Sequence, residues 1–309
     1  MRLSPINTFL SWLRRIPIIR QGLDFTRHLS VPTISIKQDT GFHPTGHSDK
    51  DLLTIVSANL WHDWPRYRDL PERLESLAQL IEDQGAQVVL LQEALRTPNI
   101  SASEWLAERL NMMYGYIRAN GEMDALGFEE GPAVLSKLPL GDVKAVNLGS
   151  SAAPLVHRMA LGAQIELECC KIWVVSTHLG FLKADNLRQM NQLRSWVSEL
   201  VGDGTAVIGG DFNAGESSQS IRLAREHWQD TYRNLNQTDD GHTHLLRLPW
   251  GGVLHSHRID YLFLNNRERD WSVVDAQHLT TEPLPYSDHK AVLARLRYMP
   301  SSDKLHQSN

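Results

Sequence analysis

Cysteine is scarce in this sequence, and long apolar runs are absent. Only two cysteines, Cys169 and Cys170, occur among 309 residues, and they are adjacent. Such a pair provides neither a disulfide framework nor the thiol set of a structural zinc site, so we interpret both as reduced and inert, like ordinary buried cysteines. The longest candidate apolar run, Val88–Leu91, is strand-sized and far shorter than the roughly 18 residues of a membrane-spanning helix. We therefore expect a soluble protein.

Charge is distributed unevenly along the chain. The formal net charge is −5, but residues 1–50 carry seven Lys and Arg against three Asp, so the remainder carries a net charge of −9. An acidic body is poorly suited to a protein that coats nucleic acid without specificity. It is compatible with an enzyme that meets phosphate through a bound cation, so the charge balance favours a metal site over a basic groove.

The composition indicates three segments. We expect a basic, amphipathic N-terminal extension and linker over 1–50, a main domain over 51–298 and a polar tail over 299–309. Arginines interrupt the apolar residues of the extension, which argues against a signal peptide and favours a cytoplasmic protein. Two interpretations of the extension stay open. It either packs on the domain itself, or it lies on an anionic membrane surface or a partner protein.

Within 51–298, short apolar stretches alternate with segments of helical periodicity. The pattern predicts helices from Leu70 to a stop at Gly85, over 103–111 and from Asp185 to about residue 200. Strands outnumber helices and several are consecutive, so we expect mixed rather than purely parallel sheets. The predicted strands are 53–59, 87–92, 133–136, 161–167, 172–177, 206–210, 258–264, 271–276 and 290–296.

Polar side chains follow many of these predicted strands. Strand ends of layered α/β proteins deliver side chains from distant parts of the chain into one crevice. One such residue is weak evidence, whereas an ordered series of them indicates a site. The series is Asn59, Glu93, His178, Asp211, Asn213, Asp260, Asp288 and His289.

The same residues lie in seven short motifs. The motifs are SANLW at 57–61, LQE at 91–93, GPAVLS at 131–136, STHL at 176–179, GDFNA at 210–214, RIDY at 258–261 and SDH at 287–289. With these motifs, in this order, the sequence resembles the endonuclease/exonuclease/phosphatase superfamily, which includes deoxyribonucleases, AP endonucleases, inositol-phosphate phosphatases and neutral sphingomyelinases. The resemblance covers 53–296. It implies an α/β fold of the α+β type, a four-layer sandwich of two mixed β-sheets flanked by α-helices.

Phosphoester hydrolysis needs a cation to offset phosphoryl charge, and three of the polar residues could hold it. Asn59, Glu93 and Asp288 offer hard oxygen ligands and no thiolate. Such a set suits Mg²⁺, or alternatively Mn²⁺, better than Zn²⁺. We therefore predict a magnesium site that uses these residues.

The remaining residues suit the other steps of the reaction. His178 and His289 could donate hydrogen bonds to nonbridging phosphate oxygens, Asp211 could accept a proton from the attacking water, and Asn213 could orient that water or the phosphate. The resemblance further implies that Asp260 pairs with His289 and fixes the tautomer of its imidazole.

Three further features have open interpretations. The resemblance suggests that Glu130 could hold His178, although it could equally be an ordinary loop carboxylate. Arg158 could contact phosphate or form a surface ion pair. Residues 231–257 form a long segment that we predict to be a loop at the substrate entrance, where Trp250 would stack on the substrate. Its histidines also raise an alternative zinc site at His242, His244, His255 and His257.

The function predicted from the sequence is a Mg²⁺-dependent phosphoester hydrolase that cleaves phosphodiesters. Its partner would be a phosphoester in nucleic acid, in a phospholipid or in a small molecule, and the acidic body with its basic extension favours a small or membrane-borne substrate. A phosphomonoesterase and a noncatalytic binding module on the same scaffold are the alternatives. The sequence does not determine the oligomeric state.

Overall fold

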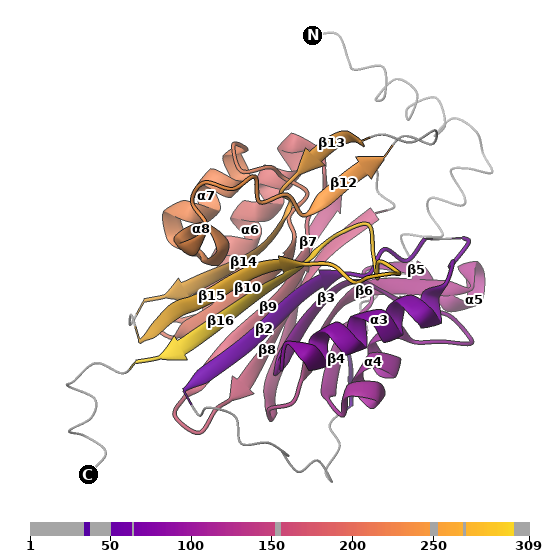
Figure 1. Ribbon diagram of the computed structural model, residues 1–309, viewed down its shortest axis with the longest axis horizontal. Coiled ribbons are helices and arrows are strands. Elements are labelled where there is room, and N and C mark those ends of the chain that lie inside the picture. Colours follow the sequence, from indigo (N-terminus) through magenta and orange to yellow (C-terminus); the bar gives the residue numbers. More distant parts are fainter. Residues whose placement is uncertain are drawn as a thin grey trace.

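The structure is a computed structural model that describes residues 34–37, 51–63, 65–151, 156–247, 253–267 and 270–299. Figure 1 shows strands at the centre of the molecule, with α3 and α4 on one side and α6, α7 and α8 on the other. The described helices are α3 (Leu70–Asp83), α4 (Ala102–Leu110), α5 (Met123–Leu126), α6 (Lys183–Val201), α7 (Gln219–His227) and α8 (Thr231–Leu235).

Two mixed sheets carry the fold, and a short hairpin is added to them. The first sheet has the order β1 (Ile34–Lys37), β4 (Met113–Ile117), β6 (Phe128–Ser136), β3 (Val88–Arg96), β2 (Leu52–Asn59), β16 (Ala291–Tyr298), β15 (Trp271–Leu279), with β5 (Asn120–Glu122) paired to β6. The second sheet has the order β11 (Gln229–Asp230), β14 (Asp260–Asn266), β10 (Thr205–Asp211), β9 (Lys171–His178), β8 (Val156–Glu166), β7 (Leu140–Ser151). Strands β12 (His244–Arg247) and β13 (Val253–His257) form the hairpin. The pairs β2–β3 and β9–β10 are parallel, and the other pairs are antiparallel.

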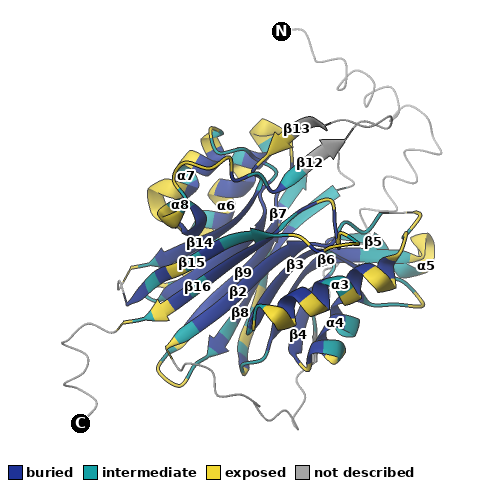
Figure 2. Cartoon of the chain, in the orientation of Figure 1, coloured by how far each residue is buried: buried dark blue, intermediate teal, exposed yellow. Residues whose placement is uncertain are grey.

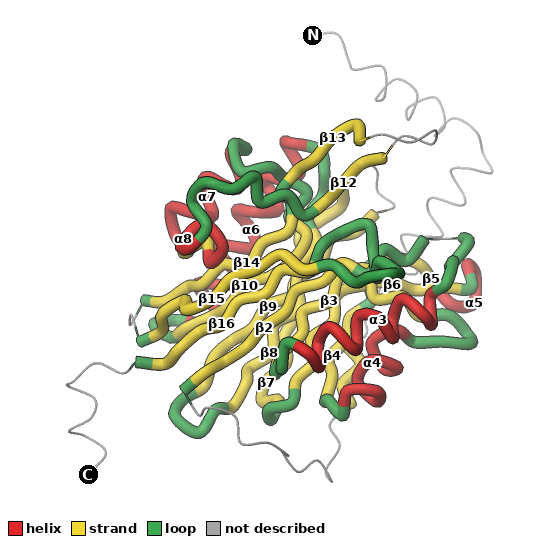
Figure 3. Tube along the Cα trace, viewed as in Figure 1, coloured by secondary structure: helices red, strands yellow, loops and turns green. Residues whose placement is uncertain are grey.

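Alternation along the strands produces the layers. In β2, Leu53 and Ile55 belong to the apolar core between the sheets, whereas Val56 and Ala58 belong to the core shared with α3 and α4. Successive side chains of a strand point to opposite faces, so one strand supplies two cores. A third core joins the outer face of the second sheet to α6 and α7. Figure 2 shows the strands largely buried and the helices partly exposed, and Figure 3 shows helices on either side of the strands. Together with the three apolar cores, this confirms the predicted four-layer sandwich.

The helices and strands predicted over 51–298 all correspond to observed elements. The interpretation of 231–257 as one loop was wrong, because α8 and the hairpin β12–β13 occupy much of it. The hairpin strands are short and the Pro and Gly residues between them resemble a loop in the sequence, which hid the pairing. The expectation of buried cysteines was also wrong for Cys169, which is exposed in the turn between β8 and β9.

Part of the N-terminal extension joins the first sheet. Ile34 to Lys37 pair with β4 as an edge strand, while the rest of 1–50, Trp250 and the tail from residue 300 onward lie outside the described residues. None of the helices in the described ranges has the length and apolar character needed to cross a membrane.

A buried arginine connects the second sheet to α8. Arg258, whose side chain is 1% exposed, donates two hydrogen bonds to Asp230 at 2.6 and 2.9 Å and one to Glu216 at 3.0 Å. Its guanidinium also lies 4.5 Å from the ring centre of Tyr261. Arg233 and other arginines around Glu216 lower the pKa of that carboxyl to about 2, although partial burial opposes the shift. The cluster therefore stabilises the fold as long as Glu216 is ionised.

This cluster predicts acid sensitivity. The pKa of Glu216 is lower in the folded chain than its ordinary value of 4.5, so the stabilisation is complete above pH 4.5 and is lost as the pH falls toward 2. We expect Glu216→Gln to remove about 2 kcal/mol of pH-dependent stability across this window, measured by urea unfolding at a series of pH values. Asp203→Asn is the control, because the Asp203 side chain is 98% exposed. Equal pH dependence in wild type and Glu216→Gln would contradict the prediction.

Candidate active site

Three polar residues line up at one end of the second sheet. In the register of the strands, Asp211 at the end of β10 is paired with His178 at the end of β9 and with Asp260 at the start of β14. All three side chains are buried. A rigid sheet therefore presents an imidazole and two carboxylates side by side.

The glycine before Asp211 allows this close arrangement. A Cβ atom at Gly210 would lie 1.9 Å from the carbonyl oxygen of Thr177 on the neighbouring strand. Only glycine fits such a close approach of two backbones. Gly210 therefore keeps β9 and β10 together where His178 and Asp211 leave the sheet.

Glu93 enters the site through a break in the regular strand pattern. The register between β3 and β6 shifts between Leu91 and Ala94, and Glu93 has a left-handed backbone with φ of 53°. A bulge of this kind redirects a side chain, and unfavourable backbone conformations of this kind concentrate at functional sites. Asn213 also has a positive φ, of 48°, just after β10.

Asn59 links the two sheets at the end of β2. Its amide nitrogen donates to Asp211 Oδ2 at 3.1 Å and to Glu93 Oε1 at 3.4 Å. Its amide oxygen accepts a hydrogen bond from the backbone nitrogen of Trp61 at 3.0 Å. In this arrangement Asn59 presents a donor to two carboxylates and uses its oxygen to hold the following loop.

Asn213 and His178 form the neighbouring contact. The amide nitrogen of Asn213 lies 3.0 Å from His178 Nε2 and also donates to the carbonyl oxygen of Leu179 at 3.0 Å. Since that nitrogen is a donor, Nε2 of His178 is the acceptor, and the imidazole is neutral. Burial, with Arg158 and His289 nearby, lowers the pKa of His178 well below its ordinary value, in agreement with the neutral form. Its Nδ1 is buried and makes no hydrogen bond within the described part of the chain.

Asp260 holds His289 from the other side. Its carboxylate oxygens lie 2.9 and 3.1 Å from His289 Nδ1, and Oδ2 also accepts a hydrogen bond from Thr243 Oγ1 at 2.6 Å. Thr243 Oγ1 in turn accepts from the backbone nitrogen of Asp260 at 3.1 Å. The carboxylate is thus fixed on both sides, and it directs Nε2 of His289 toward the open side of the site.

Two residues of the site have shifted pKa values, which suit one as a proton acceptor and the other as a hydrogen-bond donor. Burial and the charge of Asp260 raise the pKa of Asp211 to about 7. Burial disfavours protonation of His289, but the charge and hydrogen bond of Asp260, with Asp211 and Asp288, outweigh it and raise its pKa to about 10. Near neutral pH, Asp211 can accept a proton and protonated His289 can donate a hydrogen bond.

Asp288 lies beside a histidine that the sequence analysis did not place in the site. His244 Nε2 is 3.7 Å from Asp288 Oδ2, and His289 Nε2 is 3.9 Å from Asp288 Oδ1. The ring centres of His244 and His289 are 4.6 Å apart. Thr243 was missed as well, although both residues lie in the histidine-containing segment considered for zinc. Their role depends on the hairpin, which the sequence did not reveal.

The histidines considered for an alternative zinc site do not gather into one group among the described residues. His242 lies 3.0 Å from Asp240 through Nδ1 and 3.0 Å from Lys290 through Nε2. His257 is opposite His244 in the hairpin register, and its side chain is exposed. Of the described side chains in the segment, His244 is the one that joins a potential metal-binding group, with Asp288 and His289.

Glu130 and Arg158 lie in a cavity beside the site. Glu130 is buried and accepts a hydrogen bond from Asn120, so its described contact differs from the suggested one with His178. Burial and the charge of Glu93 raise the pKa of Glu130. Arg158 lines the same cavity, and its Nε has no hydrogen-bond partner among the described residues.

Two cavities border the site. One, of about 490 Å³, is lined by Glu93 and His178, together with the apolar side chains of Phe128 and Val156. The other, of about 840 Å³, is lined by Asp288 and His289, together with Trp61, Arg68, Thr243, His244 and Lys290. Asn59 connects the two cavities, because its amide donates to Glu93 in the first and accepts from the backbone nitrogen of Trp61 in the second. The arrangement therefore leaves open space on both sides of the strand-end residues.

Comparison with protein families gives one match that spans most of the chain. A model of the Endonuclease/Exonuclease/phosphatase family matches residues 56–289. No curated protein sequence matches the chain.

Solved structures share the fold at low sequence identity. A protein of this family from Leptotrichia buccalis C-1013-b has a TM-score of 0.66 at 18% identity, over 80% of this chain and 100% of that one. The human Nocturnin catalytic domain with bound sulfate has a TM-score of 0.66 at 14% identity, over 87% and 97%. TDP2 from D. rerio, complexed with a single-strand DNA product, has a TM-score of 0.62 at 18% identity, over 80% and 99%. At these identities the similarity establishes the shared fold.

Proposed function

Because the chain belongs to the endonuclease/exonuclease/phosphatase family, we propose that it is a divalent-metal-dependent hydrolase of phosphodiesters. The family consists largely of hydrolases that act on phosphoester bonds. The observation that carries the proposal is the hydrogen-bonded group at the strand ends, in which Asn59 joins Glu93 to Asp211 and Asp260 holds His289. It combines proton acceptors and donors with carboxylates from both sheets.

The donor set fits a hard cation. Glu93 and Asp288 are partly exposed carboxylates, with side chains 21% and 36% exposed, and buried Asp211 lies one hydrogen bond from Asn59, which also contacts Glu93. Carboxylate oxygens are the preferred ligands of Mg²⁺ and Mn²⁺. Burial and the charge of Asp260 raise the pKa of Asp211, and a nearby cation would offset the contribution of that charge. We propose Glu93 and Asp288 as direct ligands. Asn59 faces the carboxylates through its amide nitrogen. We propose that it orients these carboxylates, or that its amide rotates and its oxygen becomes a metal ligand.

Each of the remaining residues has a separate role in the proposed reaction. When bound, the metal ion supplies charge stabilisation for the phosphoryl oxygens. Asp211 Oδ2 accepts the proton of the attacking water, since its pKa of about 7 suits a base near neutral pH. Asn213 positions that water or a phosphoryl oxygen through its amide. His289 Nε2 donates a hydrogen bond to a nonbridging oxygen, and Asp260 keeps the ring in the orientation required.

The two cavities favour a diester over a monoester. A diester carries one substituent on each side of the phosphorus, and each cavity lies beside part of the site. The apolar wall of the smaller cavity and Trp61 in the larger one offer surfaces for a base, a sugar or a lipid headgroup. TDP2 from D. rerio, which shares the fold, was solved with a single-strand DNA product, so we propose nucleic acid as the first substrate class to test.

The proposal predicts hydrolysis that depends on a divalent metal. We expect the purified protein to hydrolyse bis(p-nitrophenyl) phosphate and to nick supercoiled plasmid with Mg²⁺ or Mn²⁺. We expect EDTA to abolish both activities and added Mg²⁺ to restore them, because the carboxylates cannot stabilise the phosphoryl charge themselves. Product release and gel mobility are the measurements.

The controls separate the alternatives. Faster hydrolysis of p-nitrophenyl phosphate than of the diester would indicate a monoesterase. An intact plasmid together with diester hydrolysis would direct the search to sphingomyelin, phosphoinositides and soluble phosphodiesters. Folded protein that binds neither Mg²⁺ nor Mn²⁺ in calorimetry and hydrolyses no ester would contradict the proposal and favour a binding module.

A further inference from the structure

We infer that His244, Asp288 and His289 form a site for a borderline transition-metal ion such as Zn²⁺, distinct in its ligands from the oxygen site proposed for Mg²⁺. The two sites share Asp288. The inference that the protein binds Zn²⁺ is independent of the proposed hydrolase function, whereas its consequence for activity rests on that function.

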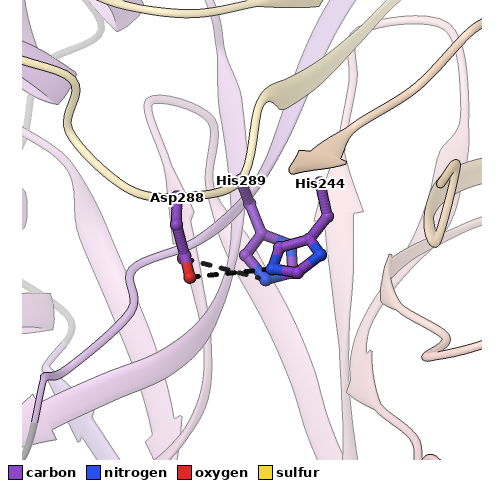
Figure 4. A group of neighbouring side chains, drawn as sticks. All are labelled: His244, Asp288 and His289. Atoms are coloured by element: carbon purple, nitrogen blue, oxygen red, sulfur yellow. Dashed lines mark ion pairs between the residues drawn. The ribbon is translucent and has the colours of Figure 1, made fainter. Parts of the chain in front are cut away.

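The geometry of the three side chains carries the inference. Figure 4 shows His244 and His289 directed toward the same region as the carboxylate of Asp288. One ligand atom from each residue lies within 4.8 Å of the others, with Asp288 oxygens 3.7 Å from His244 Nε2 and 3.9 Å from His289 Nε2. Ligands about 2.0 Å from a tetrahedral Zn²⁺ are about 3.3 Å apart, so a small inward movement of the side chains completes the site.

The surroundings hold both imidazoles in place. His289 Nδ1 is paired with Asp260 at 2.9 Å, which leaves Nε2 as the atom available to a metal. A carboxylate behind a histidine ligand in this way fixes the ring and increases its basicity toward the metal. The backbones of His244 and His289 are joined by an antiparallel β-bridge. The two ligands therefore come from segments that are distant in sequence but are fixed against one another.

The ligand types select the metal. Two imidazoles and one carboxylate match the sets that bind Zn²⁺ with a fourth position left open, whereas Mg²⁺ prefers oxygen ligands. The carboxylates of Asp211, Asp260 and Asp288 all lie close enough to His289 to interact with it, and their negative charge favours a divalent cation at this position. Zn²⁺ bound here would coordinate Nε2 of His289 and release the proton that this nitrogen otherwise carries. Under the proposed function, that atom could then no longer donate to a phosphoryl oxygen, so Zn²⁺ would inhibit hydrolysis.

The test is direct calorimetric titration of metal-free protein with Zn²⁺, without substrate. We expect one ion to bind per chain. We expect His244→Phe, which keeps an aromatic ring against His289 but has no ligand atom, to raise the dissociation constant about 100-fold, since loss even of an outer contact costs 10–100-fold. His242→Ala is the matched control, because this histidine is two residues away and pairs with Asp240 and Lys290. Its dissociation constant should equal that of wild type.

A second measurement identifies the ligands. Co²⁺ added in place of Zn²⁺ should give visible absorption typical of nitrogen-containing tetrahedral coordination, and this absorption should be lost in His244→Phe and retained in His242→Ala. Absence of Zn²⁺ binding by wild type, or equal affinities of wild type and His244→Phe, would overturn the inference. Thermal melts and His244→Ala as a second variant show whether loss of binding reflects loss of fold. Hydrolysis with Mg²⁺ in zinc-free buffer is scored separately, so failure of the zinc site and failure of the hydrolase function give different results.

Discussion

Replacement of His289 by alanine is expected to lower kcat about 1000-fold in protein saturated with Mg²⁺. The imidazole is buried, is held at Nδ1 by Asp260 at 2.9 Å and has a pKa raised to about 10. It therefore supplies a preorganised, charged hydrogen-bond donor, and alanine leaves no donor in that position. Steady-state hydrolysis of bis(p-nitrophenyl) phosphate measures the loss.

Two further variants test whether the loss of activity is specific to His289. His227→Ala changes an exposed histidine at the end of α7 and should retain wild-type kcat. Asp260→Asn tests whether Asp260 acts through His289. We expect it to lower kcat about 100-fold with KM little changed and to shift the alkaline limb of the pH profile to lower pH, because the neutral amide favours imidazolium less. A kcat within tenfold of wild type in folded His289→Ala would refute the role given to His289.

Removal of the buried guanidinium of Arg258 is expected to lower the free energy of unfolding by about 3 kcal/mol. Arg258→Met keeps most of the side-chain volume but leaves Asp230, which is 5% exposed, with Arg225 as its remaining arginine partner. An ionised carboxylate that loses a buried partner retains its desolvation cost without the compensating attraction. Urea unfolding measures the change.

A surface arginine provides the comparison. Arg109 also contacts two carboxylates, Glu75 at 2.8 Å and Glu82 at 2.9 Å, but its side chain is 32% exposed and theirs are 49% and 38% exposed. Solvent screens such pairs, so Arg109→Met should unfold close to the wild-type midpoint. The double variant Arg258→Met with Asp230→Asn should recover part of the lost stability. Equal midpoints for Arg258→Met and Arg109→Met would show that the buried cluster contributes no more to the free energy of unfolding than a surface ion pair does.

The layers of the fold could be predicted because its patterns are local. The alternation of Leu53 and Ile55 with Val56 and Ala58 indicates a strand buried on both faces, and the spacing of apolar residues after Leu70 indicates a helix. The hairpin at 244–257 could not be predicted in the same way. Its strands are short, and their pairing depends on contacts outside the hairpin, such as the bridge from His244 to His289.

The residues of the site could be predicted from their positions at strand ends, but the directions of their side chains could not. Asp211, His178 and Asp260 are aligned by strand register, which follows once neighbouring strands are known. The direction of Glu93 depends on a bulge and a positive φ, and that of Asn59 on hydrogen bonds to Asp211 and Glu93. These features arise from tertiary packing, which no local pattern encodes. The metal ligands and catalytic roles stay predictions.

The position of β16 has a consequence for synthesis of the protein. This strand, Ala291–Tyr298, lies between β2 and β15 inside the first sheet, and Asp288 and His289 directly precede it. A nascent chain that has not yet released these residues from the ribosome lacks an inner strand, and β2 cannot complete its pairing. The site on which hydrolysis is proposed to depend is therefore assembled only after the residues up to Tyr298 have been translated. Proteolytic loss of β16 would therefore abolish the proposed activity, because it removes an inner strand of the first sheet.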